Sequence, residues 1–97
     1  MTQTEKDLYE RNIRYHGTQQ ETTIAMEECS ELIQAISKCK RYGGFIDNHR
    51  DNLIEEIADV LIIINELQLI YDISDNDIEN IKKYKMDRMD YRIKNNL

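Results

Sequence analysis

The sequence predicts an all-α fold, with one domain over residues 1–97 built as a bundle of four helices. The chain contains no Pro and three Gly, so few of its residues interrupt helices. Apolar residues recur every three or four positions in the longer segments, which is the spacing of amphipathic helices. Residues that typically begin and end helices lie at the borders of these segments. Nothing in the pattern indicates a sheet.

The first two helices are expected over residues 5–16 and 18–41. Gly17 is expected to stop the first helix, because Gly readily adopts the left-handed conformation found after helix ends. Thr18 is expected to cap the second helix while the Glu21 side chain reaches back to the cap, an arrangement called a capping box. Gly43 and Gly44 then end this helix.

The third helix is expected to begin between Asn48 and Asp51, which are both good capping residues, and to end near Tyr71. Ser74 together with Asp77 predicts a weaker cap for a fourth helix. That helix continues almost to the last residue of the chain.

The third helix is apolar on nearly every side and includes the unbroken run Val60-Leu61-Ile62-Ile63-Ile64. A helix that is apolar all round must be covered all round, and one small chain offers too few other helices to do so. We therefore expect a homodimer or homotetramer in which this central helix packs against another copy. Glu66 and Gln68 interrupt the run, so it is too short to span a membrane.

The net charge of −6 argues against a nucleic-acid polymer as a partner, because no basic stripe is present to neutralise its phosphates. The first residues contain no apolar stretch after their basic positions, so no signal peptide is expected. We therefore expect a cytoplasmic protein with no membrane partner. An acidic chain can still bind a small polyphosphate when metal ions lie between the two sets of negative charges.

Two pairs of acids occupy positions that should be apolar, namely Glu28 with Glu31 and Glu56 with Asp59. At about 100° per residue, Glu28 and Glu56 fall within the apolar stripes of their helices. A carboxylate that faces a core is costly unless a positive group meets it, and neither stripe carries one. A divalent cation is the simplest compensation, whereas the competing interpretation places these acids on a solvated face.

Carboxylate oxygens are preferred ligands of Mg²⁺ and also suit Mn²⁺. Acids spaced i, i+3 on two facing helices would place four such groups around one cavity, as in the metal sites of helix bundles. No His lies three residues from any of these acids, which disfavours the Glu-x-x-His sites of di-iron bundles.

The segments Glu27-Glu28-Cys29-Ser30-Glu31 and Glu56-Ile57-Ala58-Asp59 resemble the EExxE…ExxD pattern of the MazG-like, all-α nucleotide pyrophosphohydrolases. EECSELIQAISK and LIEEIADVLIII resemble the two central helices of that family, and IKKYKMDRMDYRI resembles the last helix of its short bacterial and phage members. The resemblance covers the central half of the chain well and the ends more loosely. It implies a Mg²⁺-dependent enzyme that cleaves a nucleoside triphosphate between the α and β phosphates, giving a monophosphate and pyrophosphate in nucleotide-pool house-cleaning.

By this resemblance, Glu28, Glu31, Glu56 and Asp59 would be the metal ligands. Glu28 or Glu31 could also accept the proton of the attacking water, and the sequence does not choose between them. Glu27 points about 100° away from Glu28, so it is expected to support the site from outside the set of ligands.

Lys85 and Arg88 on the fourth helix are the candidates for binding the phosphates of the substrate. The competing interpretation is a solvated basic face that balances neighbouring acids. His16 and His49 are expected at the surface. Four aromatic residues could stack a base or pack in a core: Tyr15, Tyr42, Phe45 and Tyr71.

A different class of function also fits part of the pattern. A non-catalytic helical interaction module, in which the acids pair with a basic partner protein, explains the apolar third helix equally well. It does not explain why the acids lie within the apolar stripes, so the enzyme is the preferred interpretation.

Overall fold

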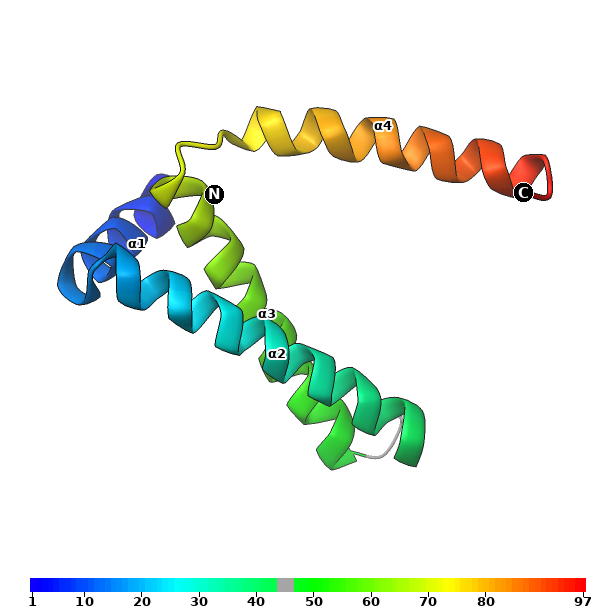
Figure 1. Ribbon diagram of the computed structural model, residues 1–97, viewed down its shortest axis with the longest axis horizontal. Helices are drawn as coiled ribbons and strands as arrows, with labels where there is room; N and C mark the ends of the chain where they lie inside the picture. The colour runs from blue at the N-terminus through cyan, green and yellow to red at the C-terminus, as the bar shows by residue number, and fades with distance from the viewer. Residues whose placement is uncertain (44–46) are drawn as a thin grey trace.

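The structure, a computed structural model, describes residues 1–43 and 47–97. The described chain forms four helices, which confirms the all-α prediction (Figure 1). Gly44 and Phe45, predicted as part of a helix stop and as a base-stacking residue, lie outside the described residues. The helices are α1 (Gln3–His16), α2 (Thr18–Tyr42), α3 (Asp47–Ile70) and α4 (Asp75–Lys94).

Helix α1 begins two residues earlier than predicted because Thr2 caps it. The Glu5 amide donates to Thr2 Oγ1 at 3.1 Å, and the Thr2 amide donates to Glu5 Oε1 at 2.7 Å, which completes a capping box. The predicted stop at Gly17 is confirmed. Gly17 has φ +87°, and its amide donates to the Ile13 carbonyl at 2.7 Å.

The capping box predicted at Thr18 and Glu21 is wrong. Thr18 is already the first residue of α2, Gly17 occupies the cap position, and no side chain caps this helix. The physical reason is the single-residue link between α1 and α2, which leaves Thr18 no room outside the helix. The Glu21 side chain is buried, with 2% of its surface exposed, so it points into the protein and not back along the backbone.

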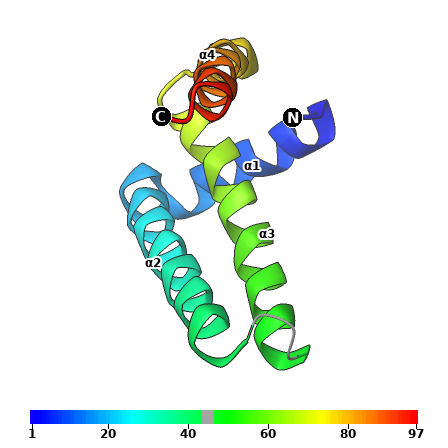
Figure 2. The same ribbon diagram turned by 90° about the vertical axis from the view of Figure 1, so that its right-hand side faces the viewer.

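Helices α2 and α3 run antiparallel and make most of the tertiary contacts (Figures 1 and 2). Helix α1 lies across the end of this pair where α2 begins and α3 ends, and contacts both. The buried apolar residues are few, namely Tyr9, Ala25, Ala35 and Ile63. The core of the described chain is therefore a narrow seam between two helices, with α1 closing one end.

Helix α4 leaves this three-helix body and extends away from it (Figure 1). Its predicted cap is confirmed, since the Asp77 amide donates to Ser74 Oγ at 3.0 Å and the Ser74 amide donates to Asp77 Oδ2 at 2.9 Å. Buried Gln68 holds the start of α4 through a 2.9 Å hydrogen bond from its Nε2 to Asp75 Oδ1. Every residue of α4 is exposed.

Much apolar surface is left uncovered by this arrangement. On α3, Ile63 is buried, but Leu61 is 59% exposed. On α4, Ile81 and Met89 are 57% and 61% exposed. The apolar third helix is therefore covered only in part by its own chain. None of the four described helices is long and apolar enough to cross a membrane.

Candidate metal centre

The seam between α2 and α3 carries three pairs of acids that face each other. In each pair the two carboxyl groups lie within hydrogen-bonding reach, one from α2 and one from α3. The antiparallel packing produces this repeat, because a step along α2 in one direction matches a step along α3 in the other. The pairs are Glu31 with Glu56, Glu28 with Asp59, and Glu21 with Glu66.

The predicted metal ligands come together at the middle of this seam. One carboxylate oxygen from each of Glu28, Glu31 and Glu56 lies within 4.8 Å of the others. Asp59, the fourth predicted ligand, lies beside Glu28, and both line a cavity of about 190 Å³. Glu28, Glu56 and Asp59 are half-buried, whereas Glu31 is exposed at the mouth of the cluster.

The electrostatics of this cluster favour a bound cation. Burial, followed by the nearby carboxylate of Asp59, raises the pKa of Glu28 above its ordinary value. Burial, followed by Glu31, raises the pKa of Glu56 in the same way. Glu28 Oε2 and Glu56 Oε2 are both buried and have no hydrogen-bond donor.

Among the described residues, no positive group compensates this charge. Within residues 1–43 and 47–97, no ion pair involves any of the four predicted ligands. Carboxylates in this state are stabilised when a hard divalent cation bridges them. The type of the oxygens and the convergence of three of them within 4.8 Å therefore fit a site for a hard divalent cation such as Mg²⁺ or Mn²⁺.

The third facing pair lies at the inner end of the same cavity. Glu21 and Glu66 are 2% and 3% exposed. From α1, Asn12 Nδ2 donates to Glu66 Oε1 at 2.8 Å, and His16 Nδ1 lies 2.9 Å from Glu21 Oε1, although not in hydrogen-bonding orientation. Burial, followed by the neighbouring carboxyl of Glu21, raises the pKa of Glu66 to about 7.

The sequence prediction did not identify this inner pair. Glu21 was assigned to a cap and Glu66 was treated as an interruption of an apolar run, and His16 was expected at the surface although it is half-buried against Glu21. A usable signal was present in the spacing. Glu21 lies seven residues before Glu28, and Glu66 lies seven after Asp59, which is about two helical turns in each case.

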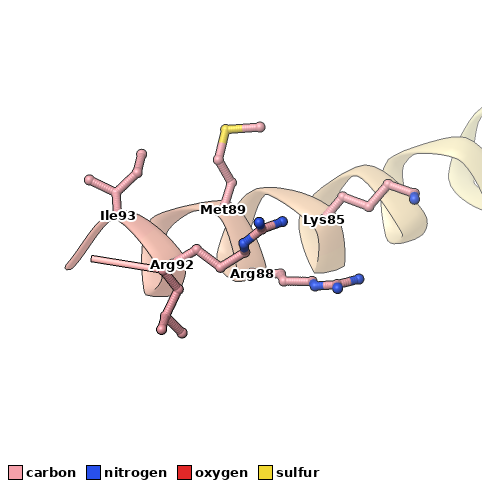
Figure 3. Close-up of a pocket in the computed structure, with 6 residues that line it drawn as sticks. Lys85, Arg88, Met89, Arg92 and Ile93 are labelled. Atoms are coloured by element: carbon pink, nitrogen blue, oxygen red, sulfur yellow. The ribbon is translucent and has the colours of Figure 1, made fainter. Parts of the chain in front are cut away.

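The remaining predicted site residues lie apart from the acids. Glu27 is exposed and does not belong to the cluster. Lys85 and Arg88 line a cavity of about 350 Å³ whose walls are all α4 or the residues just after it (Figure 3). One chain therefore does not bring these basic residues to its own acidic cluster.

The aromatic candidates are also dispersed. Tyr15 is 85% exposed, and Tyr42 stacks on His49 with 5.5 Å between ring centroids. Tyr71 is 62% exposed and lines an apolar groove of about 590 Å³ together with Met26 and Ile33. None of these three tyrosines lines the acidic cavity.

Comparison with known proteins gave one match. The sequence model of a family described as "MazG nucleotide pyrophosphohydrolase domain" matches residues 17–95. This range includes both acidic motifs and helix α4. No curated protein and no solved structure matches the chain.

Proposed function

The chain belongs to the MazG nucleotide pyrophosphohydrolase family, and on that premise we propose that it hydrolyses nucleoside triphosphates between the α and β phosphates. The products are a nucleoside monophosphate and pyrophosphate, and the role is removal of non-standard or surplus nucleotides from the cytoplasmic pool. The observation that carries this proposal is the cluster of Glu28, Glu31 and Glu56, whose carboxylate oxygens converge within 4.8 Å. A solvated acidic face would keep these groups apart.

The cofactor in this proposal is Mg²⁺, with Mn²⁺ as a substitute. Bound in the cluster, the ion would screen the phosphate charges and increase the acidity of a water molecule at neutral pH. Glu28, Glu31, Glu56 and Asp59 would hold it, in agreement with the general dependence of the family on divalent metals.

The acids also have roles of their own in hydrolysis. Glu31 is exposed and Glu28 is half-buried, and each lies close enough to the cluster to accept the proton of the attacking water. Glu27, which is exposed next to Glu28 and lies outside the cluster, would support the site without binding the metal.

The phosphates need positive partners, and Lys85 and Arg88 are the proposed ones. Because both lie on α4, away from the cluster of their own chain, they would reach the phosphates of a neighbouring subunit. A homodimer or homotetramer would also cover the exposed apolar residues of α3 and α4, such as Leu61 and Ile81. The oligomer and the complete active site are in this view the same assembly.

A product assay tests this function. The purified protein is incubated with Mg²⁺ and a panel of canonical and modified nucleoside triphosphates, and pyrophosphate is resolved from orthophosphate. Pyrophosphate with the matching monophosphate is the expected result, and a parallel preparation of Glu56→Gln controls for contaminating enzymes. A folded, oligomeric protein that is silent across the panel would instead support a non-catalytic interaction module.

A further inference from the structure

One side of the α2–α3 pair is an apolar groove of about 590 Å³ that no residue of α1 or α4 lines. Met26 and Ile33, which line it, are 68% and 67% exposed. Helix α1 closes a different side, because Ile24, which lines the cavity beside α1, points about 160° away from Met26 on the helix. The groove residues used below are Thr22, Met26, Cys29 and Ile33 on α2, Leu67 on α3 and Tyr71 just after it.

The groove carries no charged side chain, although 33% of the residues of the chain are charged. A side of such a chain that faced water would normally carry several Lys, Arg, Asp or Glu residues. Other sides of α2 do so, since Glu27, Glu31 and Lys38 are exposed there. A large exposed patch that lacks charge is typical of a surface that another molecule covers.

The same side continues beyond the groove along both helices. Residues three, four or seven positions apart share a helix face, which adds Ile36 on α2 and Ile57 and Ile64 on α3, all of them exposed. The stripe from Thr22 to Ile36 is about 21 Å long at 1.5 Å per residue. A surface of this length and width fits a pair of helices better than it fits a small molecule.

The exposed area of the chain agrees with a large missing contact. The chain exposes 7736 Å², whereas a folded monomer of its mass exposes roughly 5,800 Å². Two chains that buried this excess against each other would hide roughly 3,800 Å², within the range of roughly 2,000–5,000 Å² seen in obligate homodimers. Helix α4 contributes to the excess, and even half of the total would exceed a standard interface of about 1,600 Å².

Helix α4 of another copy is a poorer occupant of the groove. Its apolar side chains line a surface together with Lys85, Arg88 and Arg92. The groove offers these cations no carboxylate, and a buried charge without a partner is costly. An uncharged face is matched best by another uncharged face.

We propose that this uncharged α2–α3 face is a two-fold interface, in which it packs against the same face of a second copy to form a core of four helices. A two-fold interface brings one patch against itself, so the patch must be self-complementary, as an uncharged apolar face is. Cys29 would then be covered, although it is exposed in a single chain. The metal ligands Glu28 and Glu56 precede Cys29 and Ile57 directly, so the interface would support the helices that carry them. This inference does not depend on hydrolysis.

The reactivity of Cys29 tests the inference in the wild-type protein without any nucleotide. The native protein is labelled with iodoacetamide, and mass spectrometry of tryptic peptides separates Cys29 from Cys39 because Lys38 lies between them. We expect Cys29 to react at least about tenfold more slowly than in the urea-unfolded protein. Equal rates would show that the groove is open and would overturn the inference. Protection that appears only when a nucleotide is added would assign the groove to the substrate and would overturn it as well.

Charged substitutions in the groove provide the second test. Met26→Asp and Ile33→Glu place a carboxylate at exposed positions, so each chain should keep its helicity by circular dichroism. Light scattering should show that the assembly loses at least half of its mass, and Cys29 should become reactive. Gln34→Glu adds the same charge one residue away, at an exposed position outside the groove, and is the matched control.

Two results of this second test would contradict the inference. A wild-type monomer, or an unchanged mass in both groove variants, would show that this face is not the interface. If Ile81→Glu on α4 exposes Cys29 as much as Ile33→Glu does, the groove holds α4 of the second copy and not its α2–α3 face. Pyrophosphate release by a protein with any of these results would leave the proposed hydrolysis intact.

Discussion

The α2–α3 seam and helix α4 carry charge in opposite ways. The seam places its acids in facing pairs, and several of their oxygens are buried without a donor. Helix α4 is exposed along its whole length. Its basic side chains lie in water, and three of them pair with acids three or four residues away, namely Lys82, Lys83 and Lys94. The seam holds unpaired charge inside the protein, whereas α4 holds charge in water.

This difference determines how firmly each region points to a function. Exposed ion pairs contribute about 0–1 kcal/mol and occur on many helices without a specific purpose. Buried carboxylates without a partner are costly, so a sequence that keeps them needs a ligand that compensates the cost. The acids of the seam therefore identify a site by their environment. The basic side chains of α4 can bind the phosphates of a substrate only if a second subunit brings them to that site.

The largest effect is expected from removing charge at the centre of the seam. Glu56→Gln and Asp59→Asn keep the size of each side chain but remove a metal ligand, so hydrolysis should fall by at least about 100-fold with helicity unchanged. The measurement is pyrophosphate release alongside circular dichroism. Glu55→Gln makes the same change one residue away at an exposed position and should retain activity. Wild-type rates in either ligand variant would remove that residue from the ligand set.

A smaller effect on hydrolysis is expected from removing the basic side chains of α4. Lys85→Ala and Arg88→Ala should raise KM by about tenfold, because each removes one positive partner of the phosphates. Mixing Arg88→Ala subunits with Glu56→Gln subunits should restore part of the activity, since some sites then combine an intact cluster with an intact α4. Lys82→Ala, on the same helix and paired with Glu79, is the control. No complementation in mixed oligomers would mean that α4 serves its own chain or none.

A pH effect is expected from the inner pair. The pKa of Glu66 is raised from 4.5 to about 7 in the folded protein, so the folded state binds more protons than the unfolded state between these values. Its stabilising contribution is therefore complete below pH 4.5 and is lost as the pH rises through about 7, by up to about 1.4 kcal/mol per pH unit. Urea unfolding of wild type and Glu66→Gln from pH 4.5 to 8 measures this slope. An unchanged slope in the variant would contradict the assignment.

The smallest effect is expected on the stability of the metal-free protein. Glu28→Gln removes repulsion with Asp59 and the burial cost of one charge, so the melting temperature should rise by a few degrees without metal. Millimolar Mg²⁺ should raise the wild-type midpoint, and this increase should be smaller in the variant. Thermal unfolding at one fixed protein concentration measures both. A variant that melts lower without metal would show that Glu28 stabilises the fold directly.

The sequence determined the features that depend on neighbouring residues. The all-α fold, the stop at Gly17 and the cap at Ser74 follow from local conformational preferences and hydrogen bonds within a few residues. Periodicity also placed Glu28 and Glu56 on inward faces, because a helix of known pitch fixes the direction of each side chain. These predictions required no knowledge of what the helices pack against.

Only the tertiary structure decided which residues meet across the chain. The antiparallel register of α2 and α3 pairs Glu21 with Glu66, and the one-residue link at Gly17 places His16 beside them and prevents Thr18 from capping. The tertiary structure also extends α4 away from the cluster, so that Lys85 and Arg88 do not reach the acids of their own chain. Local preferences cannot encode these relations, because they arise when segments distant in the sequence bury surface against one another.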